Sequence, residues 1–170
     1  MTNHPNRSKK IIHQYRQGDI LLTEVPELPV GVSGVKAENG RLIVARGEAT
    51  GHHHSFPHNR GATLFRDDGG TSGAAFFVKV DSPEVVDGVA DLCYASYAKK
   101  REYDAAPSEI LAAEYHDLVK RAVALGAAAW EHQEHWTQAV MPAIPGICSG
   151  VYRSDNQVTY TPARLVRVED

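Results

Sequence analysis

The sequence has only two cysteines, little net charge and no long apolar run. Cys93 and Cys148 lack the spacing of a metal-binding or redox motif. This argues against a disulfide-stapled secreted domain and predicts reduced, partly buried thiols in a cytoplasmic protein. The formal net charge of −3 argues against nucleic-acid binding through overall positive charge. The apolar runs are too short to span a membrane, so no membrane partner is expected.

The amino terminus also lacks the apolar stretch of a signal peptide. Residues 1–10 are polar and include Arg7, Lys9 and Lys10, so we expect a disordered tail there. Residues 11–170 are enough for a single domain with its own core. The composition, 42% apolar and 23% charged, is that of a soluble globular protein.

Short apolar segments separated by turn residues predict β structure in the first half of the chain. We expect strands at residues 20–25, 41–45, 52–56, 63–66 and 74–80. Asn39-Gly40 is the strongest turn signal, because both positions tolerate a positive φ. It predicts a hairpin that joins residues 35–36 to residues 41–45.

The middle of the chain is rich in alanine and predicts a helical hairpin inserted over residues 82–129. The first helix would run from about 83 to 100, although Gly88 inside it weakens the pattern. The second would begin after Ser108, which can cap it, and close at Gly126. Its apolar stripe consists of Leu111, Tyr115, Leu118, Ala122 and Leu125. We expect this stripe to pack on the β domain or on a second copy of the chain, which would make a homo-oligomer.

Strand character returns after the helical segment, at about residues 136–140, 149–153 and 157–160. Residues 164–168 would form a short final strand or helix. We therefore predict a mainly β fold, a single antiparallel β-barrel or sandwich, with the α-helical hairpin inserted between two strands.

Six of the nine histidines fall in two tight clusters, and imidazole is the commonest protein ligand for transition metals. The first cluster contains His52, His53, His54 and His58. Side chains alternate across a strand, so His52 and His54 would share one face while His53 points to the other. The competing interpretation is a polar loop with exposed imidazoles. His58 is the replacement ligand if one of the others fails.

The second cluster, between Trp130 and Trp136, contains His132 and His135. Their spacing of three puts both rings on one face only if the chain turns there. We expect His52, His54, His132 and His135 to form one mononuclear metal site. The alternative is that the two tryptophans pack in the core and the histidines lie at its edge.

Two acidic residues lie close to these histidines in the sequence. Glu134 could orient a ligand or act as a general base. Glu48 could ligate the metal or accept a proton, or could form a surface pair with Arg46. His13 and His116 stand alone in the sequence, and we expect no functional role for them.

One family resemblance follows from the first cluster. Gly47 followed by His52-x-His54, among short strands, resembles the first metal-binding motif of the cupin barrels. In that family a Glu follows a few residues later and a further His comes from a later strand. Here His58 or nothing stands for the Glu, and Pro145-Gly146, which resembles part of the second motif, is followed by no His. The resemblance implies a jelly-roll barrel that binds a metal.

A second resemblance involves three strings of residues. Residues 17–22, residues 47–52 and the string His132-x-Glu134-His135 resemble a small uncharacterised group of bacterial proteins. This resemblance implies no activity. It does imply that the helices of the middle region are an insertion.

Two classes of function fit these observations. The first is a metal-dependent enzyme that uses Zn, Fe, Mn or Ni to act on a small-molecule substrate, with Glu134 or Glu48 assisting. The second is a non-catalytic, metal-stabilised or metal-sensing module that binds a protein or nucleic-acid partner. A closed site with four protein ligands would favour the module, and an open site beside a cleft would favour the enzyme.

Overall fold

The computed structural model describes residues 13–46, 51–58, 60–69, 74–81, 87–156, 158–161 and 164–167. The strands of the first half are β1 Gln14–Gln17, β2 Ile20–Glu24, β3 Ser33–Gly34, β4 Arg41–Arg46, β5 His53–Pro57, β6 Ala62–Asp67 and β7 Ala75–Val80. The helices are α1 Val89–Ala105 and α2 Glu109–Ala124. The later strands are β8 Ala128–Trp130, β9 Gln138–Val140, β10 Val151–Asn156, β11 Val158–Thr161 and β12 Arg164–Arg167.

The fold is mainly β, as predicted, and is built around one antiparallel sheet. Six strands pair in the order β1-β2-β10-β7-β6-β3, and three two-stranded sheets, β4-β5, β8-β9 and β11-β12, complete the strand pairing. These pairings among the described strands close no barrel, so the predicted barrel is not observed. Alternate residues of β2, Ile20 and Leu22, are buried, as a strand with one covered face requires.

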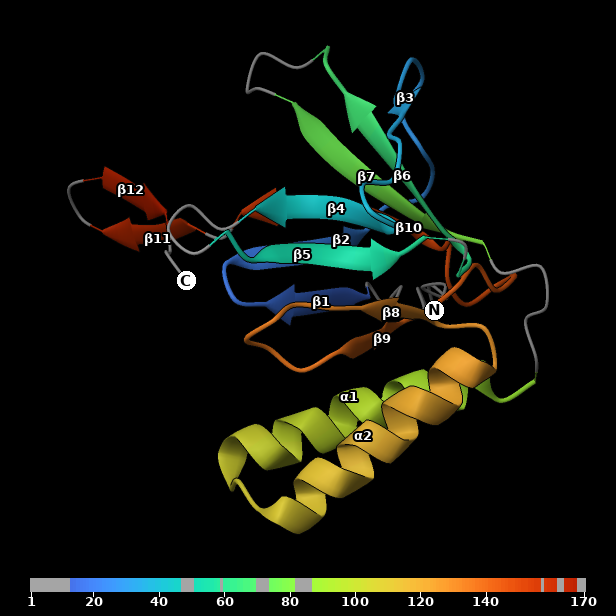
Figure 1. The fold of residues 1–170 in the computed structure, drawn as a ribbon, viewed down its shortest axis with the longest axis vertical. Helices are drawn as coiled ribbons and strands as arrows, with labels where there is room; N and C mark the ends of the chain where they lie inside the picture. The colour runs from blue at the N-terminus through green and yellow to red at the C-terminus, as the bar shows by residue number, and fades with distance from the viewer. Residues whose placement is uncertain are drawn as a thin grey trace, which may run out of the picture.

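The helical hairpin lies between β7 and β8 in the sequence, where an insertion was predicted, and packs against β8 and β9 (Figure 1). Tyr115, Val119 and Ala122 of α2 are buried in the same core as Trp130. The hydroxyl of Tyr115 donates to the carbonyl of Thr137 at 2.7 Å. The apolar face of α2 therefore packs on the β domain of its own chain.

The boundaries of the two helices follow from their flanking residues. Ser108 caps α2 as predicted, because its side chain accepts a hydrogen bond from the backbone N–H of Leu111 at 3.2 Å. The first helix was placed too early, since α1 begins only at Val89 and continues to Ala105. Gly88 has a φ of 91° and so precedes the helix. Residues 82–86, where the predicted start fell, lie outside the described residues.

The turn at Asn39-Gly40 is present, with φ values of 48° and 77°. The predicted hairpin around it is wrong, because only an isolated bridge joins Glu38 to Arg41 across the turn. β4 pairs with β5 instead, and β1 was missed by the sequence prediction. No helix among the described residues is long and apolar enough to cross a membrane. The tail predicted at residues 1–10 falls outside the described part of the chain.

Candidate metal centre

A single bridge between distant segments brings the two histidine clusters together. The backbone N–H of Ser55 donates to the carbonyl of Glu131, and the N–H of Glu131 donates to the carbonyl of Ser55, both at 2.9 Å. The side chain of Arg41 pairs with Glu131 and donates to the hydroxyl of Ser55 at 2.8 Å. His54 and His132 adjoin the two bridged residues in sequence, so the bridge places them side by side.

The four predicted ligands lie in one cluster of imidazole rings. The ring centres of His54 and His132 are 4.2 Å apart, and those of His132 and His135 are 4.8 Å apart. The centres of His52 and His132 are 5.9 Å apart, and those of His54 and His135 are 6.3 Å apart. Two imidazoles on opposite sides of one ion have centres about 6.5 Å apart, because each metal–nitrogen bond is about 2.0–2.1 Å. The separation of His54 and His135 is close to this value, and the ring of His132 is stacked on both of them.

The other two histidines of the first cluster lie away from these rings. Nδ1 of His53 lies 3.3 Å from Nε2 of Gln133, and the side-chain oxygen of Gln133 accepts from the backbone N–H of His53 at 3.1 Å. His58 is exposed at the end of β5. His52 immediately precedes β5, and its ring lies beside His132. The pKa of His53 is lowered by partial burial and then by Arg41 and Arg46.

Gln17, which the sequence prediction did not select, fixes the orientation of His54. The side-chain N–H groups of Gln17 donate to the carbonyls of Trp130 and Trp136 at 3.3 and 3.1 Å. The amide oxygen of Gln17 lies 3.0 Å from Nδ1 of His54. Because this oxygen can only accept, Nδ1 of His54 carries the hydrogen. A neutral His54 therefore presents the lone pair of its Nε2, which is the form that binds metal.

Asp19, the second residue that the sequence prediction missed, lies on the other side of His54. It is in the turn between β1 and β2, after Gly18, whose φ of 56° favours glycine. Its Oδ1 is 3.7 Å from Nε2 of His54, and both side chains are largely buried. A nitrogen lone pair repels a carboxylate unless a proton or a cation lies between them. The separation is beyond hydrogen-bond range but suits two ligands of one ion.

Glu134 contacts two further rings of the cluster, those of His52 and His132. Its Oε1 lies 3.0 Å from Nδ1 of His52, a close polar contact that holds the ring of His52 against Glu134. Its backbone N–H donates to Nδ1 of His132 at 3.1 Å. Nδ1 of His132 is thus an acceptor, and the hydrogen of a neutral ring must be on Nε2. In this form the hydrogen of His132 is on Nε2, whereas that of His54 is on Nδ1.

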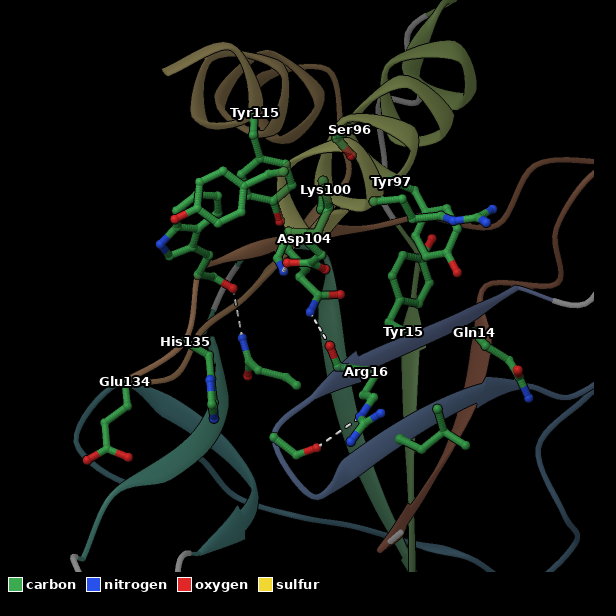
Figure 2. A pocket seen from close by; sticks show the side chains of 18 residues that line it. Gln14, Tyr15, Arg16, Ser96, Tyr97, Lys100, Asp104, Tyr115, Glu134 and His135 are labelled. Carbon is green, nitrogen blue, oxygen red and sulfur yellow. Dashed lines mark hydrogen bonds and ion pairs between the residues drawn. The ribbon is translucent and has the colours of Figure 1, made fainter. Parts of the chain in front are cut away.

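A cavity of about 670 Å³ adjoins this cluster. Gln17, Glu134 and His135 belong both to the cluster and to the cavity wall. The other walls are α1, β1 and the segment around Trp136 (Figure 2). A volume of this size accommodates a small organic molecule. One ring of the imidazole cluster, His135, therefore lines a space large enough for a substrate.

The remaining candidates of the sequence prediction have other positions. Glu48 lies outside the described residues. His116 is exposed on α2 and packs on Trp136, with ring centres 4.7 Å apart. The expectation of reduced thiols agrees with Cys93 and Cys148, which are both buried and free.

His13, expected to stand alone, lies in a second group of potential ligands with Glu24 and Cys148. Its Nδ1 is 2.6 Å from Oε2 of Glu24, and its Nε2 is 2.9 Å from the hydroxyl of Tyr94. The hydroxyl of Tyr152 lies 3.2 Å from Sγ of Cys148. Burial alone would raise the pKa of Glu24, but hydrogen bonds from the Ser149 backbone and from His13 lower it overall. These side chains already bond to one another, as in a structural network.

Comparisons with known proteins add a partial family match. Residues 16–87 match the family described as Domain of unknown function (DUF8820). This segment contains Gln17, Asp19, His52 and His54, whereas His132 and His135 lie beyond it. No curated protein and no solved structure matches the chain.

Proposed function

We propose that this chain is a metal-dependent enzyme that acts on a small molecule. One divalent transition-metal ion, Zn, Fe, Mn or Ni, would be held by Nε2 of His52, His54 and His135 together with the carboxylate of Asp19. The observation that carries the proposal is the orientation of His54. Gln17 holds its hydrogen on Nδ1, and the opposite nitrogen faces a buried carboxylate within the imidazole cluster.

The roles of the neighbouring residues follow from their contacts. Gln17 is a positioning residue, because it accepts the hydrogen of the His54 ring and leaves the other nitrogen of that ring for the metal. Glu134 contacts the ring of His52. Of the resemblance to cupins, this proposal keeps only the use of His52 and His54 as ligands of the same ion.

The cavity favours an enzyme over a non-catalytic module. On an ion that takes five or six ligands, such as Fe, Mn or Ni, three histidines and one carboxylate leave a position for water or substrate. Zinc in tetrahedral geometry would be filled by these four ligands. His135 and Glu134 form part of the cavity wall, and a small molecule in the cavity could reach that position beside them. A bound ion there would polarise a carbonyl or lower the pKa of a bound water. A module stabilised by metal would need neither the open position nor the cavity.

The metal site can be tested by elemental analysis of protein purified without chelator. We expect about one equivalent of a transition metal in the native chain and in His58→Ala, which removes an exposed imidazole outside the cluster. We expect most of the metal to be lost in His54→Ala and Asp19→Asn, with the fold checked by circular dichroism. Native metal content in folded His54→Ala protein would contradict the site.

The open position can be tested separately with cobalt. The visible spectrum of Co(II)-substituted protein should change on addition of azide, because an external ligand can enter an open coordination position. Glu134→Gln should leave this response intact. A spectrum insensitive to azide would indicate a closed site and favour the alternative function, a metal-stabilised module that binds a protein or nucleic acid.

A further inference from the structure

The cavity beside the imidazole cluster has one wall made by a single face of α1. Tyr97, Lys100, Arg101 and Asp104 all line it. Their spacing of three and four residues places them along one stripe of the helix. Arg16 of β1 lines the same cavity, and Figure 2 shows it on the strand side, with Tyr97 and Lys100 on the helix side.

The charges on these walls are only partly compensated. Nζ of Lys100 lies 2.5 Å from Oδ1 of Asp104 and 5.7 Å from the ring centre of Trp136. Arg16 donates from Nε to the carbonyl of Gly18 at 3.3 Å, which compensates no charge. Among the described carboxylates, none pairs with Arg16 or with Arg101. Two guanidinium groups with no acidic partner in the described chain therefore line one cavity in a chain of net charge −3.

The same cavity offers flat apolar surface. Tyr103 and Trp136 both line it, and their ring centres are 4.2 Å apart. Tyr97, half exposed on α1, adds a third ring. Aromatic faces favour flat ligands, and guanidinium groups favour carboxylates and phosphates, which they bind with paired hydrogen bonds.

We propose that this cavity binds a small organic anion with a flat body, whose carboxylate or phosphate group pairs with Arg16 and Arg101. The flat body lies along Tyr103 and Trp136. The end remote from the charged group lies toward His135. The inference rests on the proposed function only for this last point, because the ion at the histidine cluster would act on that end. Binding of the anionic group itself requires no metal.

Calorimetric titration with three matched probes tests this proposal. Benzoate and phenyl phosphate carry the two anionic groups on one flat ring, and benzamide is a neutral relative of benzoate. We expect at least one anion to bind the native protein at least ten-fold more tightly than benzamide. The anion that binds identifies the group that the cavity accepts. Equal binding of all three probes, or no binding of either anion, would overturn the proposal.

Substitutions then locate the site. Arg16→Gln and Arg101→Gln should each weaken anion binding about ten-fold, the usual effect of losing a charged hydrogen bond. Arg66→Gln is the matched control, because Arg66 is an arginine paired with Asp68 outside this cavity. Equal anion affinity in all three variants would refute the assignment to these arginines.

Repeating the titrations after chelation separates this inference from the proposed function. Anion binding that is lost in Arg16→Gln but present with and without metal supports the cavity assignment. If the native protein proves to hold no metal, the proposed function fails while this result stands. If metal is present and neither anion binds, the anion cavity fails while the metal site stands.

Discussion

The amide oxygen of Gln17 lies 3.0 Å from Nδ1 of His54 and accepts its hydrogen. The two residues are on different strands, β1 and β5, which belong to different sheets. Both N–H groups of the amide are bonded to backbone carbonyls, so it cannot exchange its oxygen for its nitrogen without losing two hydrogen bonds. One glutamine thereby determines which nitrogen of His54 faces Asp19.

Gln17→Leu should lower metal affinity about ten- to one-hundred-fold, because the ring of His54 loses the acceptor that orients it. Gln14→Leu, on the exposed face of the same strand, is the control and should bind metal normally. Competition with a chromogenic chelator measures both affinities. Gln17→Glu keeps an acceptor for His54 and should retain more affinity than Gln17→Leu. Equal affinities in all four proteins would show that Gln17 has no effect on the site.

Replacing single histidines of the first cluster should separate the two faces of the strand. His53→Ala should keep the native metal content, because its ring contacts Gln133 rather than the other imidazoles. His52→Ala should lose metal, because it removes one of the three imidazoles proposed to hold the ion. Elemental analysis of the two purified variants measures the difference. Similar metal content in both would mean that the cluster acts only as a histidine-rich surface.

Gly150→Ala should destabilise the protein by roughly 3 kcal/mol or more, from positive-φ strain and backbone overlap together. Its φ is 70°, and an added Cβ would lie 2.5 Å from the backbone nitrogen of Ala143 and 2.5 Å from the backbone oxygen of Val80. Gly40→Ala is the control, with a φ of 77° but open space around the Cβ, and should cost about 1–2 kcal/mol. Urea unfolding of both variants measures the difference, and equal losses would exclude the overlap as a cause.

Stability should fall as the pH rises above about 9. Burial, and secondarily Cys148, raises the pKa of Cys93 from 9.0 to about 12. Burial likewise raises the pKa of Tyr15 and of Tyr115 well above 10.0. These groups lose protons more readily in the unfolded chain, so stability is complete below their unfolded pKa values and declines toward the folded values. Thermal unfolding between pH 8 and 11 measures the decline, and a constant unfolding temperature would contradict it.

The local parts of the fold were predictable, and the long-range pairings were not. Asn39-Gly40 and the Ser108 cap act within a few residues, so the sequence alone predicts them. β1 was missed because its sequence, Gln-Tyr-Arg-Gln, has one apolar residue and no strong strand preference. The partner of β4 was misassigned. The turn signal predicts pairing with the segment just before β4, whereas the structure pairs β4 with β5, the next strand in the sequence.

The sequence pointed to the histidines that lie in this cluster, but not to Gln17 or Asp19 beside them. The spacing of His52 and His54 is itself evidence, because alternation on a strand decides which rings share a face. Gln17 and Asp19 flank Gly18, where polar residues are ordinary turn chemistry, so nothing local marks them as partners of a histidine. The family match over residues 16–87 includes both residues but gives no role for them. The contact between His54 and Gln17 requires the packing of β1 against β5, which no local pattern encodes.

The bridge between Ser55 and Glu131 has a consequence for the strength of the whole chain. The described chain has no disulfide, and the two backbone hydrogen bonds of the bridge close a loop that contains both helices. An ion bound to His54 and His135 would form a second, reversible link between the two ends of that loop. Because the ion would leave when the chain unfolds, its binding would oppose unfolding, and the effect would grow with the free concentration of the ion. Metal supply would then regulate the lifetime of the folded protein as well as its chemistry.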